Sequence, residues 1–118
     1  MLNIKPINEN QVVHVTVSGT VTKEDYEQLL PQLESLLQLH ETVRFYVDLE
    51  GLSGFEAEAL WEDIKFDAKH KDQYGKTAIV GDKRWEEWGT KISSFFLDAE
   101  MRFFYTAQST QAWEWVNS

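Results

Sequence analysis

The segment from Val43 to His70 restricts the fold of this chain most strongly, because a buried strand is followed by a long amphipathic helix. Apolar and polar side chains alternate from Val43 to Leu49, and this period of two predicts a strand with one face in the core. Beyond a glycine-bearing turn at residues 51–54, apolar side chains recur at helical spacing. A helix that connects two strands of one sheet normally makes a right-handed crossover, so this unit predicts parallel strands.

The other periodic segments repeat this pattern of strand followed by helix. The expected order of elements is β-β-α-β-α-β-α-β-α, which is typical of an α/β domain. We expect one domain over residues 1–118, with a mixed, mostly parallel sheet of about five strands and about four helices packed on it. The expected strands cover residues 2–7, 11–17, 42–49, 76–81 and 101–106, and the helices begin after Thr22, after Ser53, after Asp82 and at Ser109.

Composition removes several classes of function. A chain of 118 residues, 42% of them hydrophobic, can bury one core. Because the chain has no cysteine, a disulfide framework and a thiolate nucleophile are excluded. A net charge of −9 repels phosphate backbones, so nucleic acid is not an expected partner. With no leader pattern and no apolar run of roughly 18 residues, we expect a cytoplasmic protein, peripheral at the inner membrane face at most.

The helix that begins after Thr22 has the features of a core helix. Thr22 is expected to cap the free amides of its first turn. Pro31 removes one backbone hydrogen bond inside the helix, which predicts a kink near residues 27–31 rather than a break. The apolar stripe could alternatively form the seam of a homodimer, but a short stripe with a proline favours packing within the chain. The stripe consists of Tyr26, Leu29, Leu30, Leu33, Leu36 and Leu37.

Two polar residues have structural explanations. His14 alternates with valines in the second expected strand and has no acid or nucleophile beside it, so we expect a surface or sheet-edge histidine. Ser53 begins a Ser-Gly-Phe-Glu capping box and is expected to be the N-cap of the next helix. The residues around Ser53 match neither a nucleophile elbow nor a phosphate-binding glycine loop.

The helix after Ser53 also carries a set of acidic side chains and a histidine on one face. Asp63, Asp67 and His70 recur at spacings of four and three, so they could bind a divalent cation. Such sites usually need a further ligand from elsewhere in the chain, and charges on an exposed face are normally just solvated. No metal and no other cofactor are therefore expected, and an enzyme built on these three residues is a minor alternative.

Surplus aromatic residues coincide with a basic segment. Residues 65–84 hold six basic and three acidic side chains, whereas the rest of the chain is strongly acidic. Phe66 has no place on the apolar stripe of its helix, and an exposed aromatic beside lysines is typical of a ligand-facing or interfacial helix. Trp85 and Trp88, in the next helix, either pack on the sheet or line a cleft.

Several segments make the chain resemble the SpoIIAA-like branch of the STAS superfamily, also described as STAS and CRAL-TRIO-like small bacterial proteins. The matching segments are Gly19–Glu34, Phe45–Glu50, Leu60–His70, Ala78–Trp85 and Phe95–Glu100. The resemblance implies a mixed sheet with helices packed on it and no established enzymatic activity. It also implies binding of nonpolar molecules, membranes or protein partners.

The first functional hypothesis is a non-enzymatic module that binds a nonpolar small molecule or lipid, or associates peripherally with a membrane. Its ligand would lie between the helices that follow Ser53 and Asp82. The residues expected to line this cleft are Phe55, Trp61, Phe66, Trp85 and Trp88, with Lys65, Lys69 and Arg84 at its rim.

The alternative is a regulatory switch that binds a protein partner, as anti-sigma factor antagonists do. Members of the wider superfamily carry a phosphorylated serine in an Asp-Ser-x-Gly turn, and Ser53 is the matching candidate. This chain departs from that pattern, because Leu52 stands in place of the aspartate and Gly54 follows the serine directly. A phosphate at a helix N-terminus would nevertheless be electrostatically favourable.

Overall fold

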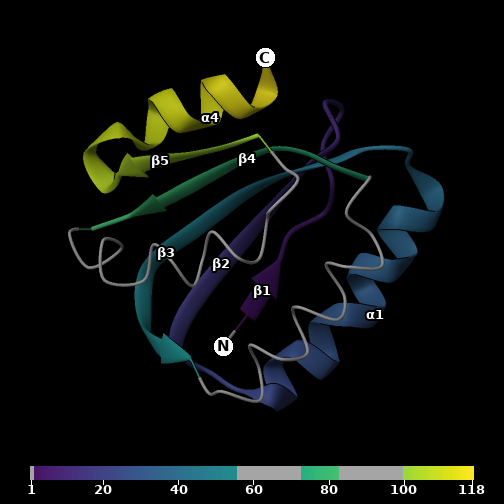
Figure 1. Cartoon of the computed structure of the whole chain (residues 1–118), viewed down its shortest axis with the longest axis horizontal. Helices are drawn as coiled ribbons and strands as arrows, with labels where there is room; N and C mark the ends of the chain where they lie inside the picture. Colours follow the sequence, from purple (N-terminus) through teal and green to yellow (C-terminus); the bar gives the residue numbers. More distant parts are fainter. Residues whose placement is uncertain (1, 56–72, 83–99) are drawn as a thin grey trace.

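The structure is a computed structural model, which describes residues 2–55, 73–82 and 100–118 (Figure 1). Five strands form one sheet in the order β1-β2-β3-β4-β5, and only the β1–β2 pair is antiparallel. The expectation of a mixed, mostly parallel sheet of five strands is thereby confirmed. The strands are β1 (Leu2–Ile4), β2 (Val12–Val21), β3 (Val43–Phe55), β4 (Tyr74–Gly81) and β5 (Met101–Tyr105).

The described residues contain two α-helices, α1 (Lys23–Leu39) and α4 (Ser109–Asn117), and a 3-10 turn η2 (Thr106–Gln108). About four helices were expected, and the two predicted after Ser53 and Asp82 fall on residues that lie outside the described ranges. The observed order of the other elements agrees with the predicted one.

Helix α1 follows the prediction closely. The Thr22 hydroxyl accepts a hydrogen bond from the Asp25 amide at 3.2 Å, and the Asp25 carboxylate accepts one from the Thr22 amide at 2.9 Å. This reciprocal capping box satisfies two free amides at the start of the helix. Pro31 lies inside the helix, which continues to Leu39; the kink stays a prediction. The buried residues of α1 are Tyr26, Leu29, Leu33 and Leu37, so the stripe packs within the chain.

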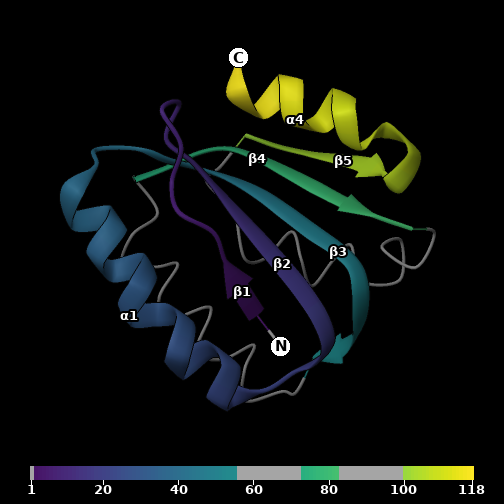
Figure 2. The ribbon, with the colours of Figure 1, turned by 180° about the vertical axis from the view of Figure 1, so that it is seen from behind.

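The sheet carries a hydrophobic cluster on each face. The larger cluster joins α1 to alternate residues of the central strands, such as Val13, Val47 and Ile79. The other joins Ala112 and Val116 of α4 to the intervening strand residues on the opposite face (Figure 2). Strands that are covered on both faces read as nearly continuous apolar runs, which explains the run at the end of β4.

The predicted ends of two strands are wrong. Strand β2 continues through Gly19 to Val21, and β3 continues through the expected turn at residues 51–54 as far as Phe55. The two extensions pair with each other, and shifts in register mark irregularities beside Gly19 and Gly51. Gly19 has a φ of +65°, a conformation that favours glycine. The glycines that resemble turn residues therefore serve bulges in two long strands.

The predicted start of the fourth strand is also wrong. The strand was expected over residues 76–81, but β4 begins at Tyr74 and includes Gly75. A side chain at Gly75 would place its Cβ 2.9 Å from a methyl carbon of Thr42 and 3.2 Å from a side-chain carbon of Arg44. Glycine therefore leaves room for these two side chains.

Candidate functional site

Most of the residues predicted to form the ligand cleft lie outside the described ranges. These are Trp61, Lys65, Phe66, Lys69, Arg84, Trp85 and Trp88, and the possible metal ligands Asp63, Asp67 and His70 belong to the same segments. Phe55 ends β3. Across residues 2–55, 73–82 and 100–118, no three His, Asp or Glu side chains are arranged to hold a metal ion.

Ser53 lies in β3 rather than at the start of a helix. Gly54 and Phe55 continue the strand, so a helix cannot begin directly after Ser53 and its assignment as an N-cap is wrong. The residue is exposed, next to the irregular pairing between β2 and β3. The serine is therefore accessible at the end of a paired strand.

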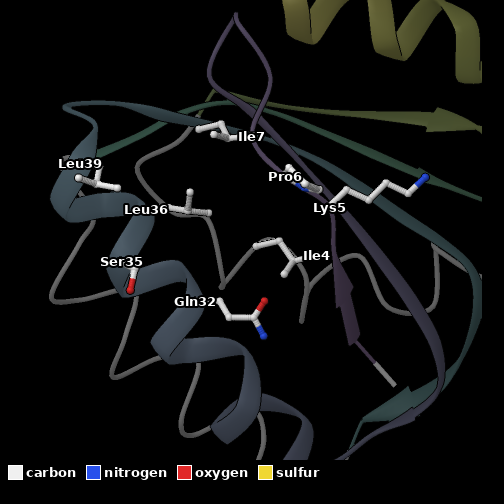
Figure 3. A pocket seen from close by; sticks show the side chains of 8 residues that line it. All are labelled: Ile4, Lys5, Pro6, Ile7, Gln32, Ser35, Leu36 and Leu39. Carbon is white, nitrogen blue, oxygen red and sulfur yellow. The ribbon is translucent and has the colours of Figure 1, made fainter.

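An apolar groove lies between α1 and the N-terminal segment that contains β1. Its volume is about 300 Å³, at the lower end of the roughly 300–1,000 Å³ usual for ligand pockets. Leu39, at the end of α1, is 78% exposed and lies on the groove wall. The residues that line the groove are Ile4, Lys5, Pro6, Ile7, Gln32, Ser35, Leu36 and Leu39 (Figure 3).

The floor of the groove is continuous with the hydrophobic core. Ile4, Ile7 and Leu36 are half-buried and pack against the cluster beneath α1. Figure 3 shows Leu36 and Ile4 on opposite walls, while the Lys5 side chain extends away from the groove. An apolar ligand seated here would therefore extend the core without burying the Lys5 ammonium.

His14 is packed under α4, contrary to the expectation of a surface or edge histidine. Strand β2 lies between β1 and β3, and the His14 ring meets Tyr46 edge-on with 4.7 Å between centroids. Trp113 of α4 lies 6.1 Å from the same ring. Within the described part of the chain, the buried Nε2 atom has no hydrogen-bond partner. Burial lowers the pKa of His14, the Lys5 charge lowers it further, and Asp48 raises it.

A second group that sequence reasoning missed surrounds Trp115. The Lys76 ammonium lies 5.5 Å from the ring centroid, and the Arg102 guanidinium carbon lies 5.2 Å from it. Arg44 donates hydrogen bonds at 3.1 Å to the carbonyl oxygens of Val116 and Ser118, at the end of α4. These residues are far apart in sequence, so no local motif could have indicated the cluster.

Similarity to known proteins assigns the family. The family model described as SpoIIAA-like matches residues 12–117. This chain belongs to the SpoIIAA-like family. A solved structure of an uncharacterised protein of the DUF3478 family with a SpoIIAA-like fold, from Shewanella loihica PV-4, is 30% identical with a TM-score of 0.79. The match covers 98% of this chain and 92% of that one. Comparison with curated proteins gives no significant match.

The SpoIIAA-like fold is compatible with a non-enzymatic regulatory module. Neither similarity names a reaction or a ligand. Among the helices that the structure describes, none is both long and apolar enough to cross a bilayer. For this SpoIIAA-like protein, the groove, Ser53 and the cations around Trp115 are therefore the features from which function can be argued.

Proposed function

We propose that this SpoIIAA-like protein is a non-enzymatic module that binds a nonpolar small molecule or lipid. The observation that supports the proposal is the groove between α1 and the N-terminal segment, whose walls are mostly aliphatic and whose floor meets the core. Leu39 is a large apolar side chain that is mostly exposed there. Covering such surface with an acyl chain gains about 25 cal/mol per Å².

The test uses the purified full chain with cis-parinaric acid, a fluorescent fatty acid, and organic extraction of any lipid that copurifies. The double variant Leu36→Gln/Leu39→Gln should weaken probe binding roughly tenfold, because two leucine contacts are lost. Tyr105→Gln is the matched control, since Tyr105 is also exposed but lies outside the groove. Absence of extracted lipid together with no saturable binding would contradict the proposal.

Peripheral membrane association is a second part of the proposal and would use the helices predicted after Ser53 and Asp82. Flotation with vesicles of phosphatidylcholine, with and without phosphatidylglycerol, tests it separately from ligand uptake. Binding in the groove without flotation would limit the function to a soluble ligand, whereas flotation that survives the groove variant would place the membrane contact elsewhere.

A second candidate function is a switch for a protein partner, and the exposure of Ser53 favours it. A phosphate on Ser53 would add close to two negative charges to an already acidic chain. We expect Ser53→Asp to abolish capture of a partner that wild-type protein retains, with an unchanged thermal unfolding curve. Equal capture by wild type, Ser53→Asp and Ser53→Ala would argue against the switch.

A further inference from the structure

The cations around Trp115 form a positive surface on an acidic protein. Arg44, Lys76 and Arg102 come from three adjacent strands, β3, β4 and β5, and converge on the C-terminal half of α4. Across the described ranges, no acidic side chain lies within ion-pair distance of any of the three. We call Arg44, Lys76, Arg102 and Trp115 the Trp115 surface.

Two of the three cations have partners that explain them. Arg44 closes the end of α4 by donating to backbone carbonyls, and Lys76 donates to the Ser118 hydroxyl at 2.9 Å. Positive charge at a helix C-terminus is also favourable to the helix dipole. Stabilising the end of α4 therefore explains the position of Arg44. It also uses one of the three N–H donors of the Lys76 ammonium.

Arg102 has no such explanation. Its guanidinium lies over two rings, 5.4 Å from the centroid of Phe104 and 5.2 Å from that of Trp115. The residue is exposed, and its guanidinium makes no hydrogen bond within the described part of the chain. Packing on the rings restricts the side chain in advance and leaves five N–H donors for a ligand, which lowers the entropy lost on binding a carboxylate.

We propose that the Trp115 surface binds an acidic segment of a partner protein, with Arg102 receiving a carboxylate and Lys76 adding charge. This inference is independent of the groove. Charge complementarity indicates the kind of partner. A net charge of −9 opposes approach to an extended anionic sheet or polymer, such as a membrane or nucleic acid. A short acidic segment can contact the local patch alone, because charges beyond about 8 Å are largely screened at physiological salt.

The experiment titrates the full chain with a ten-residue polyglutamate peptide at physiological salt and follows binding by calorimetry and by the indole NMR signals. Arg102→Gln should weaken binding roughly fivefold, and Arg102→Gln/Lys76→Gln more strongly. Lys23→Gln is the matched control, since it removes one charge from an exposed ion pair on α1. Arg102→Lys should recover only part of the loss, because lysine keeps the charge but not the planar fork.

Thermal unfolding of each variant shows whether the substitution leaves the protein folded, so that a loss of peptide binding is not caused by unfolding. Equal weakening by Arg102→Gln and Lys23→Gln would overturn the proposal, because it would reduce the effect to net charge. The proposal would also be overturned if the peptide did not bind saturably. This holds even if the protein bound phosphatidylglycerol vesicles in an Arg102-dependent way, because the partner would then be a membrane.

Discussion

At the scale of single residues, His14 couples protonation to folding. Its ring packs against Tyr46 and Trp113, and its buried Nε2 has no hydrogen-bond partner among the residues that the structure describes. Burial and the charge of Lys5 outweigh the opposing effect of Asp48, so the pKa of His14 falls below its ordinary value. The unfolded chain therefore binds a proton more readily than the folded chain does.

This difference predicts how stability depends on pH. The contribution of His14 is complete above its unfolded pKa of about 6.5 and is lost as the pH falls towards the lower folded pKa. Urea unfolding of wild type between about pH 7.5 and 5.5 should therefore show a steeper loss of stability than His14→Phe, which keeps a ring but cannot titrate. Parallel stability curves for the two proteins would contradict this assignment.

At the scale of elements, the sequence predicts what local periodicity and capping control. Thr22 and the leucine spacing are sufficient for α1, and the alternation from Val43 to Leu49 is sufficient for the first half of β3. The ends of β2 and β3 are different, because Val21 pairs with Phe55 across a large separation in sequence. The glycine and serine residues in those ends resemble a turn when they are considered locally. They form paired strands with bulges only because the remote partner strand lies beside them.

The same distinction applies to the functional features. The aromatic cleft was inferred from neighbours in sequence, and all of its predicted residues except Phe55 lie outside the described ranges. The Trp115 surface depends on Arg44, Lys76 and Arg102, which approach one another only because β3, β4 and β5 are consecutive in the sheet. Leu39 is not part of the apolar stripe of α1, so its place on the groove wall becomes visible only once the N-terminal segment lies beside it.

At the scale of the whole molecule, one sheet separates two hydrophobic clusters. Leu33 of α1 belongs to the larger cluster, and Val116 of α4 belongs to the one on the opposite face. The two side chains share no packing partner in these clusters. A small domain of this size normally unfolds in one cooperative step, even when its core is divided by a sheet.

Separation of the clusters predicts additive effects on stability. Leu33→Ala should lower the free energy of unfolding by about 2–5 kcal/mol, and Val116→Ala by about 2 kcal/mol from two buried methyl groups. The double variant should equal the sum within about 0.5 kcal/mol, because the sites are not in contact. Urea denaturation followed by both far-ultraviolet circular dichroism and tryptophan fluorescence measures this. Separate transitions for the two probes would show that the two faces do not unfold in one cooperative step. A loss of unfolding free energy well beyond the sum of the single variants would show that the two clusters are not independent.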